Sequence, residues 1–296
     1  MDLPLESVPN FSEGRDRSTL DALLKALGGA ADVLDVHADV DHNRSVFTLV
    51  ADDEALIESL LAGIACARAR IDLRIHDGAH PRIGSADVVP IVALDRADAE
   101  QARACALRLA ERIGAELELP VFLYGESAPD RGPAFFRRGG PAELQRRLDA
   151  GELEPDFGPA RLDERAGGVI VGARRPLIAF NVNLETDDVE VARSIAALVR
   201  EKGGGFPGVR ALGLALPSVG RAQVSMNVED YEAAALHEIV ARVEQEARAR
   251  GTSVAGAELV GLMPAGAALA AAGSVLRIDG FNASHVLELR LLERRL

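Results

Sequence analysis

Apolar runs typical of strands alternate with segments of helical apolar period almost throughout the chain. In the segment that opens at Asp52, for example, Leu56, Leu60 and Ile64 recur at a spacing that places them on one helical face. The strands we predict span residues 5–11, 33–36, 45–50, 88–94, 120–124, 169–171, 177–184, 210–216, 222–228 and 258–263. The helices we predict span residues 18–27, 52–70, 97–114, 142–150, 187–202, 229–250 and 265–272.

This alternation predicts an α+β protein built from two α/β sandwiches. Short strands with hairpin-like links favour mixed or antiparallel sheets over a doubly wound parallel sheet. Domains usually hold about 100–200 residues, and the chain has 296, so two domains are expected. We place them at residues 1–175 and 176–296, because the N-terminal and C-terminal portions each have the pattern of a small α/β sandwich.

The composition of the chain restricts the classes of molecule that it can bind. Hydrophobic residues make up 48% of the chain, enough for a buried core, and the formal net charge is −13. A nucleic-acid-binding surface needs a basic face, so nucleic acid is an unlikely partner on these grounds. No basic leader or apolar stretch of about 20 residues is present, so we expect a cytoplasmic protein that does not bind membranes. Any anionic substrate must then meet a local cluster of Arg and backbone N–H groups.

Polar residues gather in loops beside strand ends, where binding and catalytic groups commonly lie. One such group lies at the end of the first predicted strand and includes Asn10 and Glu13. A second is His37-x-Asp39-x-Asp41, whose alternation places the three side chains on one side of an extended chain. His and Asp are ordinary metal ligands, but no further His or Cys cluster accompanies them. A solvated turn or an organic-ligand site is therefore favoured, and we expect no metal.

The segment from His76 to Gly84 carries the most suggestive acid–base group. His76 and His80 are four residues apart, but Gly78 and Pro81 between and beside them make a helical metal site implausible. An imidazole titrates near neutral pH, and the following Arg82 can hold a carboxylate or phosphate. Structural and catalytic interpretations of His80 remain equally open from these residues alone.

Two further groups suit a flat polar ligand. Glycines around the segment PDFGP and at Gly167-Gly168 permit close backbone approach, although they match no nucleotide-binding fingerprint. Asn181 and Asn183 alternate on one face of a predicted strand, and Asn227 follows the same alternation on another. Such amides can bind a heterocycle or tie neighbouring strands together.

Taken together, these segments resemble the formimidoyltransferase domain, which occurs as a bacterial enzyme and as the front half of animal formimidoyltransferase-cyclodeaminase. The matching stretches are VPNFSEGRD, DHNRSVFT, HPRIGSADVVP, VFLYGE, PDFGP, VGARRPLIAFNVNL, AQVSMNV and ELVGLMP, in order from Val8 to Pro264. The resemblance implies two α/β subdomains whose sheets flank a folate tunnel, and a homodimer. The chain departs from animal members at His37 and Ala166, where they carry Asp and Trp.

The resemblance implies transfer of a formimino group from N-formimino-L-glutamate to tetrahydrofolate, a step of histidine catabolism. It places the catalytic histidine of the HPR motif on His80 and the folate-contacting loop between Gly158 and Gly167. We assign Arg44 and Arg82 to the substrate carboxylates, Asp39 or Asp41 to the cationic reacting carbon, and a share of the proton transfer to His37. The predicted substrate-binding residues are Asn10, Asp39, Arg44, Arg82, Gly158, Pro159, Gly167, Asn181, Asn183 and Asn227.

Two other functions use the same motifs. One is a folate-binding protein without transferase activity. The other is a different one-carbon folate activity, such as one on 5-formyltetrahydrofolate. The intact His80 favours the transferase.

Overall fold

The computed structural model describes residues 4–293, which form two compact units divided between Arg175 and Pro176. Each unit combines a sheet with helices, and the sheets are mixed in the first unit and antiparallel in the second. The predicted α+β class with mixed and antiparallel sheets is therefore confirmed. Within the described part of the chain, no helix has both the length and the apolar character needed to cross a bilayer.

The first unit is built around a seven-stranded sheet in the order β1-β4-β2-β5-β7-β6, with β3 paired to β4. β5 and β6 pair with β7 in parallel, and the other pairings are antiparallel. The strands are β1 (Leu5–Ser7), β2 (Asn10–Phe11), β3 (Asp32–Asp39), β4 (Arg44–Ala51), β5 (Ala86–Val92), β6 (Val121–Leu123) and β7 (Val169–Arg174). The helices are α1 (Arg17–Leu27), α2 (Asp53–Arg70), the short 3-10 turn η1 (Arg96–Asp98), α3 (Ala99–Glu116), α4 (Pro133–Arg137) and α5 (Gly140–Asp149).

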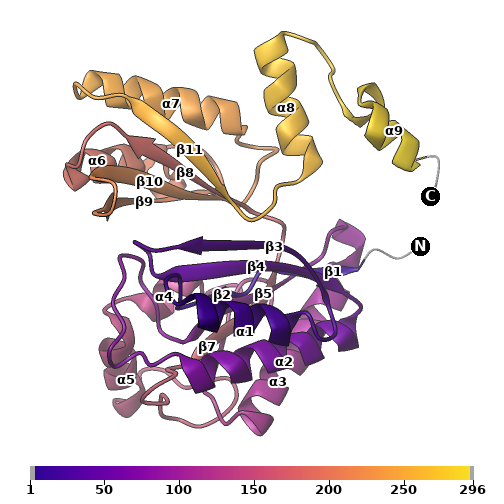
Figure 1. The fold of residues 1–296 in the computed structure, drawn as a ribbon, viewed down its shortest axis with the longest axis vertical. Helices are drawn as coiled ribbons and strands as arrows, with labels where there is room; N and C mark the ends of the chain where they lie inside the picture. The colour runs from indigo at the N-terminus through magenta and orange to yellow at the C-terminus, as the bar shows by residue number, and fades with distance from the viewer. Residues whose placement is uncertain (1–3, 294–296) are drawn as a thin grey trace. The chain divides into compact units, whose positions relative to one another are not determined.

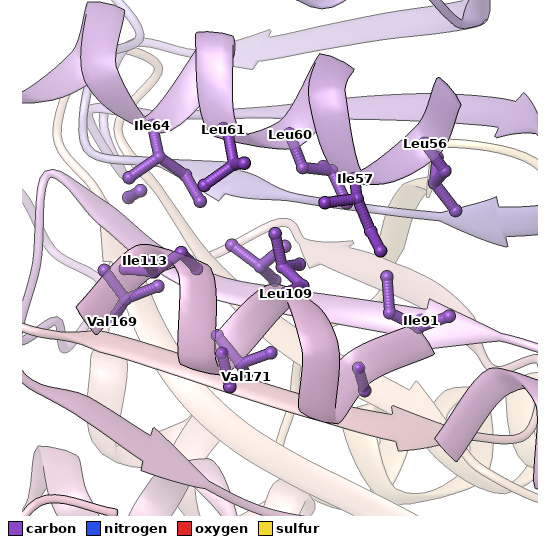
Figure 2. Packing of buried hydrophobic residues seen from close by; sticks show 14 of the residues in the cluster. Leu56, Ile57, Leu60, Leu61, Ile64, Ile91, Leu109, Ile113, Val169 and Val171 are labelled. Atoms are coloured by element: carbon purple, nitrogen blue, oxygen red, sulfur yellow. The ribbon is translucent and has the colours of Figure 1, made fainter. Parts of the chain in front are cut away.

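Apolar clusters cover both faces of this sheet at β5 and β7, whereas alternate side chains of β3 are exposed. Helices α1, α2 and α3 lie on one face (Figure 1), and Figure 2 shows aliphatic side chains of α2 and α3 packed over those of β5 and β7. On β7, Val169 and Val171 face this core, whereas Ile170 faces the opposite side. There it joins Phe136 of α4 and Leu144 of α5 in a second apolar cluster.

The second unit is a four-stranded antiparallel sheet in the order β11-β8-β10-β9. Helices α6 and α7 pack on one face, where residues such as Val182, Ile195 and Val243 are fully buried. The strands are β8 (Ile178–Leu184), β9 (Val209–Leu216), β10 (Arg221–Val228) and β11 (Val254–Val260). The helical segments are α6 (Val189–Val199), η2 (Glu201–Gly203), α7 (Leu236–Ala249), α8 (Ala265–Leu276), η3 (Ala283–His285) and α9 (Leu287–Glu293).

Several local predictions were wrong, and side-chain hydrogen bonds explain two of them. The helix predicted to start at residue 18 begins at Arg17, because Asp16 caps it with a carboxylate that accepts the N–H groups of Ser18 and Thr19. The helix predicted to start at residue 229 begins at Leu236, because the Asp230 carboxylate binds nearby N–H groups in a turn that competes with helix formation. Helix α4 was not predicted. The strand predicted over residues 33–36 continues through Asp39, so His37 and Asp39 lie in β3.

Gly84 is a position where the fold leaves no room for a side chain. A Cβ at this residue would overlap the carbonyl oxygen of Gly168, a backbone atom that cannot move aside cheaply. We predict that Gly84→Ala lowers the free energy of unfolding by about 3 kcal/mol, the cost typical of severe overpacking. Urea denaturation measures this change.

Gly132 offers a matched control, because a Cβ there would meet nothing within 4 Å and its φ of −120° suits any residue. Gly132→Ala should change the free energy of unfolding by less than about 1 kcal/mol. Equal effects at the two glycines would contradict the close packing of Gly84 on Gly168.

Candidate active site

The candidate site is assembled in the first unit by β2, β4, β5 and the loop that joins α2 to β5. Arg44 opens β4 and pairs in register with Asp39 at the end of β3. Asn10 lies on β2, whose neighbours are β4 and β5. The loop from α2 to β5 carries His80 to the side chain of Arg44. The sheet therefore brings together residues that are 34 to 70 positions apart, the separations of Asn10 from Arg44 and of Asn10 from His80.

The hydrogen bonds of His80 define its tautomer. Nδ1 lies 2.8 Å from the Pro81 carbonyl oxygen, which can only accept, so Nδ1 carries the hydrogen. Arg44 Nη1 lies 2.6 Å from Nε2 and 2.9 Å from Nδ1, and a guanidinium can only donate. Nε2 is therefore the acceptor. The neutral imidazole presents one basic nitrogen, and that nitrogen faces Arg44.

The surroundings of His80 favour this neutral form. Burial lowers the pKa of His80 well below its ordinary value, and the positive charges of Arg44 and Arg137 lower it further. The hydrogen bond to the Pro81 carbonyl opposes these effects. Since the pKa lies below 6.5, the imidazole is unprotonated at pH 7 and can accept a proton.

Arg82 holds the His80 loop against the start of β4. Its Nε and Nη2 atoms donate to the His80 carbonyl at 3.1 and 2.8 Å, and Nη2 also donates to the His42 carbonyl at 2.6 Å. Nη1 donates to the Asn43 carbonyl at 2.8 Å and lies 3.0 Å from His76 Nε2. A guanidinium has five N–H groups, and these contacts occupy all of them. The geometry favours a positioning role; binding of a substrate carboxylate by Arg82 stays a prediction, and it requires one of these contacts to break.

Arg44 is less completely paired. Besides the contact with His80, its Nη2 donates to Asn10 Oδ1. Its Nε–H is buried and has no acceptor among the residues that the structure describes. Burial, followed by the charge of Arg137, lowers the pKa of Arg44 to about 9, so the guanidinium is still charged at neutral pH. Arg44 thus has a charge and a donor to offer an anion beside His80.

The acidic residues after His37 divide between strand and turn. His37 and Asp39 lie on β3, whereas Asp41 follows the end of the strand, so the alternation predicted for the three residues stops at Asp39. Asp39 Oδ1 accepts the N–H of His42 at 2.7 Å, which shapes the turn into β4. This turn carries the carbonyl groups of His42 and Asn43 that Arg82 binds.

The segment from Gly158 to Gly167 is joined to the His80 loop by backbone hydrogen bonds. Ser85 N–H donates to the Ala166 carbonyl at 2.8 Å, and Gly168 N–H donates to the Ile83 carbonyl at 3.1 Å. Gly158 and Gly167 have φ values of +80° and +72°, which favour glycine. Gly167 also lines a cleft of about 240 Å³ that continues to Arg74 and Gln145. Pro159 is exposed next to Gly158.

The three predicted amides lie in the second unit, on the sheet face away from α6 and α7. In register, Asn183 pairs with Gln223 and Asn181 with Ser225. Gln223 Nε2 donates to Asn183 Oδ1 at 2.9 Å, and Asn181 Nδ2 donates to Glu258 Oε2 of β11 at 3.2 Å. Asn181 and Asn183 therefore tie neighbouring strands together, while Asn227 is exposed.

Two site residues escaped the sequence analysis. Asp87 of β5 is 2% exposed; its Oδ1 accepts the N–H of Ile83 at 2.7 Å and its Oδ2 pairs with Arg137 of α4. Asp87 is the carboxylate in the otherwise apolar strand sequence ADVVPIV. A buried carboxylate needs a partner, so this pattern could have identified Asp87 as a residue of interest. Nothing comparable marks Arg137, because its helix lies in the irregular stretch.

Comparisons with known proteins agree across both units. The model of the formiminotransferase domain, N-terminal subdomain, matches residues 4–174, and that of the formiminotransferase domain matches residues 179–285. A glutamate formimidoyltransferase of Streptococcus pyogenes serotype M1 is 38% identical over 97% of this chain and 98% of its own length. One from Thermoplasma acidophilum is 38% identical over 97% of each chain. Rat formimidoyltransferase-cyclodeaminase is 39% identical over 90% of this chain and 51% of its own length.

The contacts of Arg82 predict a large contribution to the free energy of unfolding. Arg82→Met would leave the carbonyls of His42, Asn43 and His80 without their donor, and hydrogen bonds to charged groups contribute about 1.5–3 kcal/mol each. We predict that the free energy of unfolding falls by about 3 kcal/mol in urea denaturation. Arg17→Met, which removes an exposed ion pair with Asp21, should cost less than about 1 kcal/mol. A loss at Arg82 no larger than that at Arg17 would contradict the positioning role.

Proposed function

Because the chain belongs to the formiminotransferase family, we propose that it is a glutamate formimidoyltransferase. The reaction moves the formimidoyl group of N-formimino-L-glutamate to N5 of tetrahydrofolate and yields 5-formimidoyltetrahydrofolate and glutamate. The observation that carries the proposed chemistry is the neutral His80, whose Nε2 is the basic atom of the site. Tetrahydrofolate is a co-substrate, and the group transfer as written needs no metal or redox cofactor.

The transfer exchanges one carbon–nitrogen bond for another. The N5 lone pair attacks the formimidoyl carbon, and the tetrahedral intermediate then breaks its bond to the glutamate nitrogen. One proton leaves N5 and one proton arrives on the glutamate nitrogen, so these two proton transfers balance each other. A single group that accepts the first proton and donates it to the leaving nitrogen meets both needs.

We assign this proton transfer to His80 Nε2. Nδ1 is already protonated and held by the Pro81 carbonyl, which fixes the ring and leaves Nε2 as the atom that gains and loses the proton. The same carbonyl stabilises the imidazolium that forms in passing. The low pKa of His80 means that the imidazolium is a strong acid, which favours its return of the proton to the leaving nitrogen.

Arg44 is the proposed anchor for a carboxylate of N-formimino-L-glutamate. In the absence of substrate it donates to Nε2, the atom that must accept the proton. A carboxylate forms stronger charge-assisted hydrogen bonds with a guanidinium than a neutral imidazole does. Substrate binding would therefore draw Arg44 from His80 and expose Nε2 as the substrate arrives. Asn10, which accepts from Arg44, would help to orient it.

The remaining predicted contacts divide between the two substrates. Asp39, in register with Arg44, is the proposed carboxylate for the cationic amidine carbon. The segment from Gly158 to Gly167 is the proposed folate loop, supported by its backbone bonds to the His80 loop and by the cleft beside Gly167. Asn181, Asn183 and Asn227 stay predicted ligands of the pterin or formimidoyl nitrogens. A homodimer, a cytoplasmic location and a role in histidine breakdown are proposals that rest on family membership.

His80→Ala should reduce kcat at least about 100-fold while leaving the Kd for tetrahydrofolate nearly unchanged, because general acid–base catalysis contributes about 10²–10⁴-fold. The assay mixes the protein with N-formimino-L-glutamate and tetrahydrofolate, and follows the release of glutamate and the formation of 5-formimidoyltetrahydrofolate. His285→Ala, an exposed histidine of the second unit, is the control. Near-normal turnover by His80→Ala would refute the assignment.

The same assay separates the other functions. Wild-type protein that binds tetrahydrofolate without any turnover would favour the folate-binding protein. Turnover of 5-formyltetrahydrofolate in place of N-formimino-L-glutamate would favour the different one-carbon activity.

Arg44→Met should raise the KM for N-formimino-L-glutamate at least about tenfold and change the KM for tetrahydrofolate little, since a charge-assisted hydrogen bond contributes about 1.5–3 kcal/mol. Steady-state kinetics with each substrate varied in turn test this expectation. Equal changes in the two KM values would show that Arg44 does not discriminate between the substrates.

A further inference from the structure

One buried amide on the sheet of the second unit is only half satisfied. Gln223 of β10 is 1% exposed, and its Nε2 donates to Asn183 Oδ1 on the neighbouring β8 at 2.9 Å. Its Oε1 is also buried, but it has no donor within the part of the chain that the structure describes. A buried carbonyl oxygen without a donor costs free energy. The oxygen is therefore an acceptor that a ligand could use.

This acceptor belongs to the sheet face opposite α6 and α7. The chain neighbours Ala222 and Val224 lie in the core beneath those helices, so strand alternation turns Gln223 to the other face. Asn183 points the same way, because it is directly opposite Gln223 in the antiparallel register. Whichever way the two amide groups are turned, one hydrogen bond between them leaves at least one N–H donor and one oxygen acceptor for a ligand.

Apolar side chains continue the same face beside the amides. Leu214 of β9 is directly opposite Gln223, and Leu212 is directly opposite Ser225. Leu214 is half-buried and Leu212 is 45% exposed. A ligand lying over β9 and β10 would meet apolar surface from the leucines and hydrogen-bonding groups from the amides. That combination suits a planar heterocycle with N–H groups at its edge.

The charged groups of this face disfavour an acidic ligand at the same place. Glu258 of β11 extends the row of amides and is hydrogen-bonded to it. Arg210 and Arg221 lie at the two ends of the β9–β10 pairing. Each is already paired with a glutamate, Glu229 and Glu185 respectively. A dicarboxylate such as N-formimino-L-glutamate would have to compete with these glutamates, whereas an uncharged pteridine ring would not.

We propose that Gln223 is a binding residue for the pteridine ring of tetrahydrofolate. Its oxygen accepts an N–H group of the ring, and Asn183 donates to the ring from the adjacent position. The inference rests on the proposed function, because it assigns a residue to the folate that the transferase uses. It adds a buried acceptor to the amides predicted from the sequence. Gln223 binds and orients the ring and takes no part in the proton transfer.

The test is an anaerobic calorimetric titration of the full-length protein with each substrate. Gln223→Met keeps a side chain of similar length and removes both polar atoms, so it should raise the Kd for tetrahydrofolate at least about fivefold. The Kd for N-formimino-L-glutamate should stay close to that of the wild type. Gln245→Met is the control, because Gln245 is an exposed glutamine of α7, which packs on the other face of the sheet.

Two further measurements separate binding from a structural role. Because Gln223→Met removes an oxygen that is buried without a donor, its urea midpoint should lie close to that of the wild type. Gln223→Glu restores an acceptor and should bind tetrahydrofolate more tightly than Gln223→Met. If Gln223→Met does not fold, Gln223→Asn keeps the amide but withdraws it by one CH₂ group, and should show the raised Kd.

A wild-type Kd for tetrahydrofolate in the folded variant would overturn the inference, and so would an equal loss of affinity for both substrates. Binding is measured without turnover, so the two proposals can fail separately. A raised Kd in a protein that transfers no formimidoyl group would refute the transferase and leave Gln223 as a folate ligand. A wild-type Kd in an active variant would do the reverse.

Discussion

The imidazole of His80 is held between a carbonyl and a guanidinium, and the arrangement of the site follows from that contact. The Pro81 carbonyl accepts the hydrogen of Nδ1, and Nε2, which accepts from Arg44, is the basic atom. Arg82 supports the contact with Arg44, because its donors join the His80 loop to the turn between β3 and β4. The covalent neighbours His80, Pro81 and Arg82 therefore supply an acid–base group, its tautomeric constraint and its anchor within three consecutive residues.

The site is locally positive in a protein whose formal net charge is −13. Arg44, Arg82 and Arg137 gather around His80, and Asp87 is the carboxylate paired within this cluster. Such a field attracts an anionic substrate and at the same time disfavours protonation of the imidazole. One arrangement of charge thus serves both binding and catalysis. The burial of His80 also makes folding pH-dependent. The unfolded chain protonates His80 near pH 6.5, whereas the folded chain does so only at lower pH. The free energy of unfolding therefore decreases as the pH falls below about 6.5.

The sequence predicted the fold class and most elements, because periodicity and strand alternation report burial directly. The long helix from Asp53 and the strand ending at Leu184 lie within a residue of their predicted limits. Elements set by a single side chain were harder to predict: Asp230 delays α7, and α4 is a five-residue helix secured by Phe136 in a core made by distant strands. Those contacts depend on tertiary structure that no local pattern records.

For the candidate site, the sequence likewise predicted several residues but not their contacts. His80 and Arg44 are found together in the structure, but their distance in the sequence gave no reason to expect direct contact. Arg82 illustrates the limit most clearly, since an arginine after a histidine suggests anion binding, whereas its donors face main-chain carbonyls. Arg137 was not predicted, because its ion pair with Asp87 depends on β5 and α4 meeting in the fold. Residue type indicated the chemistry, and only the fold assigned each donor to its acceptor.

The most direct test of a neutral His80 base is the pH dependence of kcat/KM for N-formimino-L-glutamate in the wild-type protein. The acidic limb of that profile reports the essential base of the free enzyme. With the pKa of His80 lowered by burial and by Arg44, activity should stay on a plateau from neutral pH down through 6.5 and fall only at lower pH. An acidic limb centred at or above pH 6.5 would contradict the account.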